Sequence, residues 1–461
     1  MTPEQETKVL AQLYDRLYDA VTYAPPGKES AWHRDTTFIQ MGKNLVLNPD
    51  DFDDMMSPVN PEGDLGSAAA FAMFCDAQPT TGALWSDSGK TTSAAYRLIV
   101  EGANTAHKMN EEQKKIYDDA FDYLNTEVTT EDFRHNKKTV TVPSSPVIDY
   151  EAAQAAYITA VGGYRAARNG YDLSDKADQR AWNAVQPGLQ LNVDQAWNKW
   201  TRAYKEDVEL AQQALASTVN DALTAVIEQS QRLVGPQYSL ASPDGLNTFL
   251  PTYAIPSNWA SPDCQPSKLH FDSSNLSQEE SKEASSYSVS AGGSYGLWSA
   301  SGGASGSSED EHTHMESDSF VLDAELIFVQ IKRPWLNPLL FEMRDWFMSG
   351  VAAHGVSNGA SEDLRGLMPL LPTGFVVARN VTIQANFGSE DMKFHSEQTQ
   401  TQASGGWGPF SVSGSYSHSS SDRKFTSSLS GGKLSFEGLQ VIAWISSIIP
   451  ASPPLAPPAA A

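Results

Sequence analysis

A short acidic segment holds the residues whose types and spacing are best suited to bind a metal ion. Residues 309–318 read EDEHTHMESD, with two histidines in a His-x-His spacing between carboxylates. Alternate residues of a β-strand share one face, so both imidazoles and a carboxylate could reach one divalent ion. Most charge runs are instead the solvated tips of loops. The candidate metal-binding or pH-sensing residues are Glu309, Asp310, His312, His314 and Glu316.

Histidine also makes this segment a candidate for sensing pH. An imidazole changes its charge between pH 5 and 8. The two serine-rich regions described below contain five of the nine histidines in the chain. Carboxylates that become protonated cross an apolar layer more easily than charged ones. If these regions enter a membrane, we expect the activity to rise below about pH 6.

The sequence contains no recognisable catalytic motif. Residues 86–92 (SDSGKTT) end like a phosphate-binding loop, but the first glycine of that motif would fall at Leu84 and no apolar strand precedes it. The patterns GxSxG, HExxH and CxxC do not occur. We therefore predict a protein that is not an enzyme and needs no cofactor.

Two serine- and glycine-rich segments alternate apolar and hydroxyl side chains. A repeat of two residues is typical of β-strands with one apolar and one polar face. The stretch from Ser286 to Leu297 is long enough to span a membrane as a β-strand, which takes about 9–11 residues. The apolar side chains predicted to face a membrane or a partner are Tyr287, Val289, Tyr295, Leu297, Trp298, Trp407, Phe410, Val412 and Tyr416.

The serine-rich segments belong to two units that match each other. When residues 268–334 are shifted by 112 positions, they fall on residues 380–447, if one extra residue is allowed in the second unit. Within them, residues 291–310 match residues 403–422 at 10 of 20 positions. Composition alone gives roughly four such matches. The match predicts an internal duplication of Ser/Gly-rich hairpins.

The first 237 residues are typical of helices. Apolar residues recur every three or four positions in residues 3–23 and 148–169. Residues 194–234 contain neither proline nor glycine and carry such a stripe throughout, which predicts one helix of about 60 Å. A narrow apolar stripe on so long a helix favours packing against other helices. We therefore predict an N-terminal antiparallel helical bundle, residues 1–237, with one very long helix.

The predicted fold class is α+β. Residues 238–267 are rich in proline, asparagine and serine, which indicates a linker. Residues 268–450 hold both repeat units and are predicted to form a mainly antiparallel β domain, with a short amphipathic helix within residues 335–355. The Pro/Ala-rich residues 451–461 are predicted to be a disordered tail.

The composition limits which partners the protein can bind and in which cellular compartment we expect it. The 461 residues carry a formal net charge of −24, which opposes binding to nucleic acid. Two cysteines, Cys75 and Cys264, allow one disulfide at most. No apolar run is long enough for a membrane-spanning helix, and the N-terminus lacks the features of a Sec signal. We expect a protein that is soluble when made and either stays in the cytoplasm or is exported by an unconventional route.

Three functional hypotheses follow. The first is a non-enzymatic, self-associating structural or binding protein whose serine faces are the wet side of a sheet. The second is a soluble protein that inserts its amphipathic hairpins into a lipid membrane. The third is a metal-dependent enzyme centred on the acidic His-x-His segment. In the first two hypotheses the chain has itself as a partner, and in the second also a lipid membrane.

Overall fold

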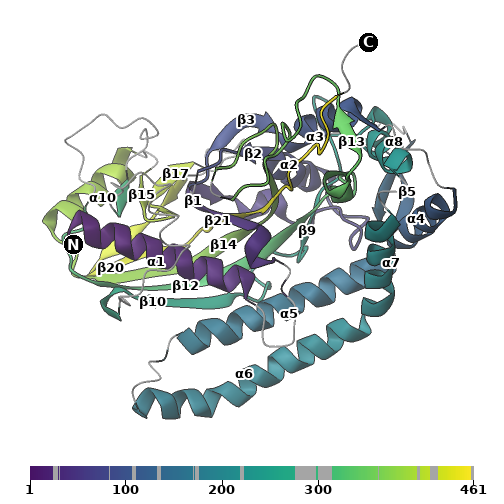
Figure 1. The fold of residues 1–461 in the computed structure, drawn as a ribbon. Helices are drawn as coiled ribbons and strands as arrows, with labels where there is room; N and C mark the ends of the chain where they lie inside the picture. Colours follow the sequence, from purple (N-terminus) through teal and green to yellow (C-terminus); the bar gives the residue numbers. More distant parts are fainter. Residues whose placement is uncertain are drawn as a thin grey trace.

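The computed structural model combines helices with antiparallel strands, so the predicted α+β class is confirmed. The fold is organised around one large antiparallel sheet (Figure 1). The structure describes residues 1–23, 30, 32–82, 84–105, 111–131, 137–169, 171, 176–218, 223–275, 297–299, 314–361, 363–401, 405–415 and 424–457.

Five strands form the centre of this sheet in the order β1, β21, β14, β12 and β10, and each neighbouring pair is antiparallel. Three short strands extend it, since β9 pairs with β12, β20 with β14 and β19 with β20. The strands of the sheet are β1 (Thr37–Leu47), β9 (Tyr253–Ile255), β10 (Ser267–Asp272), β12 (Phe320–Lys332), β14 (Leu370–Ala385), β19 (Ser428–Ser430), β20 (Lys433–Phe436) and β21 (Leu439–Ile448).

Strand β1 lies within residues 1–237, which are predicted to form a helical bundle. It pairs with β21, so the predicted boundary at residue 237 does not separate helices from strands. The apolar alternation of β1 is interrupted by a bulge between Met41 and Leu45. At Gly42 an added Cβ would lie 2.2 Å from the carbonyl oxygen of Val441, so the strands approach as closely as only glycine allows.

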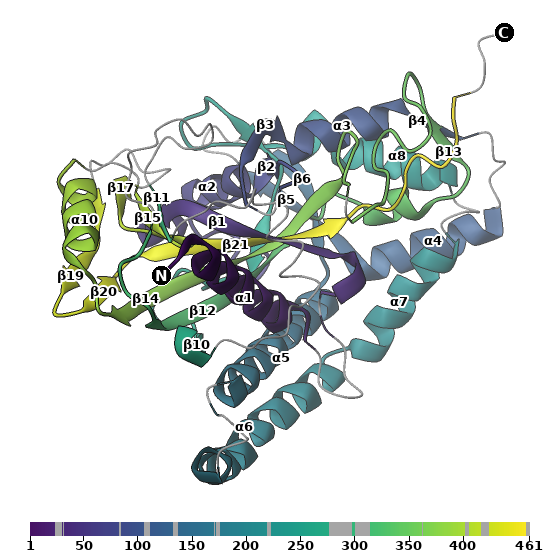
Figure 2. The ribbon, with the colours of Figure 1, turned by 60° about the vertical axis from the view of Figure 1, so that its left-hand side comes forward.

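Strands β14 and β21 are buried on both faces because layers cover both sides of the sheet. On β14, Val376 and Ala378 belong to the core under α1 (Pro3–Thr22). The alternate residues Phe375 and Val377 belong to the core under α2 (Leu65–Asp76). Figure 2 shows α1 lying across one face of the sheet. Burial on both sides explains why these strands read as continuous apolar runs.

Helix α1 has the start and the apolar stripe that its sequence predicts. Thr2 and Gln5 form a capping box, and Pro3 occupies the first turn. The stripe residues are buried against the sheet: Val9, Leu10, Leu13, Leu17 and Val21. Two tyrosine hydroxyls fasten the helix to β1, since Tyr14 donates to Ile39 O at 2.9 Å and Tyr18 to Thr37 O at 3.0 Å.

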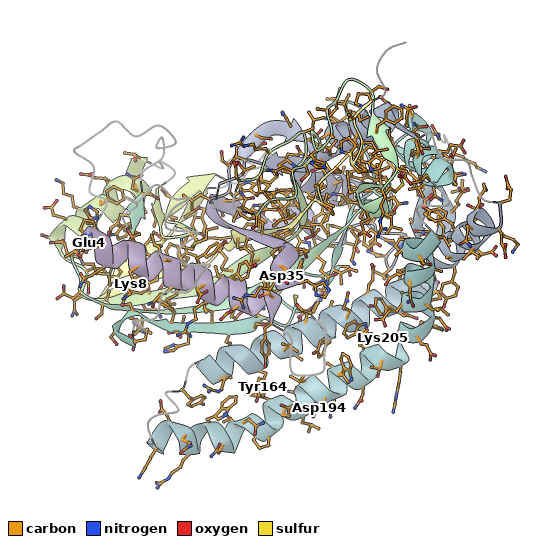
Figure 3. The ribbon with its side chains drawn as sticks, in the orientation of Figure 1. Glu4, Lys8, Asp35, Tyr164, Asp194 and Lys205 are labelled. Carbon is orange, nitrogen blue, oxygen red and sulfur yellow. The ribbon has the colours of Figure 1, made fainter. Side chains whose placement is uncertain are left out.

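The other helices of the first half form a second layer and an arm. Helices α5 and α6 run side by side as an antiparallel pair below the body of the molecule (Figures 1 and 3). The ring of Trp200 on α6 stacks on that of Tyr157 on α5, with 5.3 Å between centroids. The helices are α3 (Thr92–Gly102), α4 (Glu111–Leu124), α5 (Ser145–Asn169), α6 (Lys176–Arg202), α7 (Lys205–Thr218) and α8 (Leu223–Leu233).

The predicted continuous helix over residues 194–234 is wrong. Helix α6 ends at Arg202 and α7 begins at Lys205, with Tyr204 between them in the left-handed region at φ 55°. The apolar stripe continues across this break, because Trp200 and Val208 both lie in the second core. Periodicity alone therefore gives no sign of the break. That core also contains Trp335 and Phe341 from beyond residue 237, so these helices are not an independent bundle.

The predicted linker and the described part of the predicted tail, residues 451–457, belong to the folded body. Within residues 238–267 the side chain of Trp259 is fully buried in the core under α2. At the C-terminus, Ser452 bridges to Ser357, and Leu455 N donates to Trp346 O. The predicted amphipathic helix within residues 335–355 is instead a 3₁₀ turn followed by a short strand. Its elements are η5 (Pro338–Glu342) and β13 (Trp346–Met348).

The remaining elements are short. Among the described residues, strands outside the central sheet also pair: β2 (Ala77–Pro79) with β3 (Asp87–Thr91), β4 (Ala103–Thr105) with β13, β5 (Asn125–Glu131) with β6 (Lys137–Pro143), and β7 (Leu240–Ala241) with β8 (Thr248–Phe249). The 3₁₀ turns are η1 (Arg34–Thr36), η2 (Pro49–Phe52), η3 (Pro236–Tyr238) and η4 (Ser273–Asn275).

Candidate functional site

Two inserts of equal length leave the central sheet. The first insert, residues 273–319, joins β10 to β12, and the second insert, residues 386–432, joins β14 to β20, with 47 residues in each. Both leave from the same end of the sheet, because Phe320 pairs with Ala385 across β12 and β14. The described elements of the inserts lie at the end of the sheet marked by α10 in Figure 1. They are η4 (Ser273–Asn275), β11 (Trp298–Ser299), α10 (Ser389–Thr401), β15 (Gly406–Trp407), β16 (Phe410–Ser411), β17 (Ser413–Ser415), β18 (Lys424–Thr426) and β19, which returns to the central sheet by pairing with β20.

The strands at the base of the two inserts pair in the same register. Adding 112 to both residue numbers of a pair in the first base gives a pair observed in the second. The four pairs of the first base are Leu269–Ala324, His270–Asp323, Phe271–Leu322 and Asp272–Val321. The four pairs of the second base are Val381–Phe436, Thr382–Ser435, Ile383–Leu434 and Gln384–Lys433.

Equivalent positions in the two bases also face the same core. Phe271 and Ile383 are both buried under α1, as are Leu322 and Leu434. A register slip of one residue would move each of these side chains to the opposite face. The two bases therefore agree in register and in burial.

A small three-stranded sheet joins the two inserts. Trp298 on β11 of the first insert pairs with Trp407 on β15, and Trp407 pairs with Phe410 on β16. These three rings are at most 1% exposed. Trp298 and Phe410, which the 112-residue shift aligns, therefore flank the same tryptophan within one core.

The small sheet gathers most of the described residues that were predicted to face a membrane or a partner. Leu297, Trp298, Trp407, Phe410 and Val412 are all buried in the core under α1. The other predicted residues, Tyr287, Val289, Tyr295 and Tyr416, lie outside the described residues.

The serines expected to face water are buried in the described part of the second insert. Gln440 on β21 accepts from Ser411 N at 2.6 Å and donates to Ser411 O at 3.4 Å. The Ser413 hydroxyl donates to Gln398 O at 2.9 Å. The apolar and the serine side chains of residues 410–413 are therefore both buried.

The buried carboxylate of Glu6 accepts hydrogen bonds from residues that precede and follow the segment 300–313. That segment lies outside the described residues. The Glu6 carboxylate accepts from Leu297 N at 3.3 Å on one side and from Met315 N at 2.5 Å on the other. Nδ1 of His314 lies 2.8 Å from the same carboxylate. Hydrogen bonds to a buried carboxylate are charge-assisted and stronger than neutral ones. Glu6 thus fastens the first insert to α1.

The buried carboxylate of Asp391 on α10 binds the same two flanks from the second insert. It accepts from Trp298 Nε1 at 2.7 Å and from Glu316 N at 3.1 Å. Gly388 N also donates to it at 3.0 Å. We call Glu6 and Asp391 the carboxylate clamps.

Two members of the predicted metal or pH-sensing set have structural contacts. His314 lies against Glu6, and Glu316 Oε2 accepts from Glu390 N and Asp391 N at the start of α10. Glu309, Asp310 and His312 lie outside the described residues. Within the described part of the chain, no group of three potential ligands is close enough to hold a metal ion.

A buried histidine lies on α10 one turn after Asp391. His395 Nε2 lies 2.7 Å from the Ser427 hydroxyl. Burial lowers the pKa of His395 below its usual value, so the ring is neutral at pH 7.

The sequence analysis missed both clamps. Glu6 has one usable signal, because it continues the apolar stripe of α1 one turn before Leu10, where an acidic residue is out of place. Asp391 has no such signal in the sequence, since an acidic residue in the first turn of a helix is ordinary.

Comparison with known proteins gives no match to a family model, a curated protein or a solved structure. None of the helices in the described part of the chain is both long enough and apolar enough to span a bilayer.

Proposed function

We propose that this chain is a non-enzymatic protein that stores two β-hairpins in a water-soluble fold and inserts them into a lipid membrane. The observation that carries the proposal is the shared register of the two bases at one end of the sheet. Each base is an antiparallel pair that an insert can lengthen without a change of register.

The lengths of the inserts support this proposal. A membrane-spanning β-strand takes about 9–11 residues. An insert of 47 residues is long enough for two such strands and a turn. The matching sequences and registers also support our proposal that residues 268–334 and 380–447 arose by duplication of one hairpin unit.

The burial of the apolar side chains is what storage requires. Trp298, Trp407, Phe410 and Val412 are hidden from water in the small sheet. Helix α1 covers the core that contains them. Once the inserts leave this core, these side chains need an apolar environment, which a bilayer supplies.

The proposal includes self-association. Two inserted hairpins from one chain give four strands with two open edges. Unpaired backbone N–H and C=O groups cost several kcal/mol each in hydrocarbon. Strands of neighbouring copies can pair with these edges, so we propose that several copies assemble.

A disulfide between the inserts tests the proposal. Ser299 and Gly406 are paired residues of β11 and β15, one from each insert. Paired strand residues have the Cα separation that a disulfide can bridge. The double variant Ser299→Cys/Gly406→Cys should be unable to release dye from liposomes when oxidised and should recover with a reductant. Both native cysteines are free, and burial raises the pKa of the Cys75 and Cys264 thiols, so neither competes readily.

Each single cysteine variant serves as the control and should release dye with or without reductant. Liposomes of zwitterionic lipid alone, with anionic lipid, and with sterol test the lipid requirement. Leakage from the oxidised double variant at the rate of the unmodified chain would contradict the proposal.

One observation favours the structural or binding hypothesis instead. The reciprocal hydrogen bonds between Gln440 and Ser411 attach the second insert to β21, in the middle of the molecule. In a permanent fold these bonds simply complete the core. Absence of leakage with every lipid composition, together with one cooperative thermal transition, would favour this function.

A further inference from the structure

Two adjoining cavities lie away from the inserts. The α5 cavity, of about 560 Å³, lies between α5 and residues 253–265. The β5–β6 cavity, of about 230 Å³, lies between the β5–β6 hairpin and residues 56–61. Small apolar side chains of α5 line the first, including Ala152 and Ala156, while eight of the eighteen residues that line the second are valines and prolines. Such walls are typical of sites for apolar ligands.

The two cavities share part of their walls. Pro58, Ile148 and Tyr253 line both of them. A ligand that reaches past these three side chains would therefore occupy both cavities, so the shape favours an elongated molecule.

Each cavity contains one buried polar atom that lacks a hydrogen-bond partner among the described residues. In the α5 cavity it is Oε2 of Glu151, and in the β5–β6 cavity it is the hydroxyl of Ser57. An unpaired buried polar atom costs about 1–3 kcal/mol, so a ligand group that pairs with it gains affinity.

The charge of Glu151 is already balanced. Its Oε1 forms an ion pair with Lys332 Nζ at 2.7 Å. The Tyr253 side chain forms a hydrogen bond with this carboxylate, so Oε2 is the oxygen left to a ligand. Burial, followed by the charge of Glu151 and this hydrogen bond, raises the pKa of Tyr253 well above its usual range. Tyr253 is therefore neutral, and the polar end of the α5 cavity offers an acceptor oxygen without requiring a cationic ligand.

We propose that the two cavities bind an uncharged amphiphilic alcohol, whose hydroxyl group donates to Glu151 Oε2 and whose apolar body lies along the shared wall. A hydroxyl supplies the missing donor, whereas an anionic head would meet the acceptor oxygen of Glu151. Long-chain alcohols and sterols both have this chemistry. The inference does not depend on the proposed membrane function.

Calorimetric titration of the full chain tests the binding and distinguishes the two sources. We expect 1-decanol to bind at one site per chain and decanoate at pH 7.5 to bind at least about tenfold more weakly, because its carboxylate has no proton to donate to Glu151 Oε2 and would lose its hydration beside that acceptor oxygen. Cholesterol supplied from cyclodextrin forms the second arm. Binding of decanol alone identifies a chain-shaped site, and binding of cholesterol at lower concentration identifies a sterol site. Failure of both ligands to bind would overturn the proposal.

Variants locate the site and test the role of the carboxylate. Ala156 is exposed on the wall of the α5 cavity, so Ala156→Phe should fill its mouth and weaken alcohol binding at least about tenfold. Ala216→Phe is the control, because Ala216 is an exposed alanine of α7 that lines neither cavity. Equal binding by both phenylalanine variants would contradict the site.

Glu151→Gln removes the negative charge and leaves Lys332 without its partner. The preference for decanol over decanoate should then disappear or reverse, an effect that a merely structural role of Glu151 would not produce. An unchanged preference would contradict the role of Glu151. Melting curves without ligand, compared with the unmodified chain, confirm that each variant is folded.

Discussion

The carboxylate of Glu6 lies 2.8 Å from Nδ1 of His314, although the two residues are 308 positions apart in the chain. Glu6 belongs to the first turn of α1, and His314 follows the central part of the first insert. This contact and the two backbone hydrogen bonds beside it fasten the insert to the helix that covers it. The first turn of α1 therefore controls how firmly the first insert is held.

Replacement of Glu6 by glutamine should loosen the first insert. Three donors converge on this buried carboxylate, and glutamine offers one oxygen and a donor of its own. We expect a loss of about 1–3 kcal/mol in the free energy of unfolding and faster hydrogen exchange in residues 297–299 and 314–317. Glu4→Gln is the control, because Glu4 lies on the exposed side of α1 (Figure 3). Equal exchange in both variants would remove Glu6 from the role of a clamp.

Replacement of Asp391 by asparagine tests the second clamp from the other insert. Asparagine keeps the shape but loses the charge that strengthens the bond from the Trp298 indole. We expect a loss of about 1–3 kcal/mol and an increase in tryptophan fluorescence quenching by acrylamide. Asp318→Asn, at an exposed position of the first insert, should leave both unchanged. If the proposed function holds, Asp391→Asn should also release dye from liposomes faster.

Lysine substitutions distinguish the stored state from the membrane state. Val412 and Ser413 are both buried, so either lysine should lower the melting temperature of the soluble protein. In a membrane-spanning strand only Val412 would face lipid, where a lysine costs roughly 2–4 kcal/mol near the midplane. If the proposed function holds, Val412→Lys should therefore abolish leakage, and Ser413→Lys should change only ion selectivity. Wild-type leakage by Val412→Lys would contradict the proposed orientation.

Acid should weaken the folded state through His395. Because burial lowers its pKa in the folded protein, the unfolded chain takes up a proton on this ring at a higher pH. Its contribution to stability is complete above about pH 6.5 and declines as the pH falls. Melting temperatures at pH 7 and pH 5 should differ more for the unmodified chain than for His395→Gln. Identical differences would mean that His395 does not contribute.

The break between α6 and α7 can be tested by whether a substitution raises or lowers the stability of the protein. Tyr204 has a positive φ, which costs a residue other than glycine about 1 kcal/mol. Tyr204→Gly should therefore leave the stability unchanged or raise it by up to about 1 kcal/mol. In a continuous helix the same substitution would lower stability by about 1 kcal/mol. Urea denaturation separates the two outcomes.

Local patterns in the sequence predict the elements that depend on local forces. The apolar stripe and capping residues of α1 can be predicted from the sequence because each involves residues within a few positions of one another. Strand β1 is not, because its bulge at Gly42 fits the backbone of Val441, about 400 residues away. The left-handed conformation of Tyr204 likewise has no signal in the sequence, which lacks glycine or proline at that point.

In the candidate functional site, too, local patterns predict some features, while others depend on contacts between distant residues. Alternation identified the aromatic residues of the inserts, since a period of two is a property of one strand. Their meeting in one small sheet depends on pairing between inserts, as between Trp298 and Trp407. Ser411 is buried where the side-chain amide of Gln440 hydrogen-bonds to its backbone. The alternation of residues around Ser411 gives no sign of this distant partner.

The pairing of Trp298 with Trp407 has a kinetic consequence. Each of these strands has only two residues. Strand β11 has β15 of the second insert as its partner, and β15 loses one of its two partners if the first insert leaves. Trp298 is also bound to Asp391, which anchors it to the second insert at another point. If the proposed function holds, the two inserts should therefore open together in one cooperative step. A lipid that binds one insert should then also release the other.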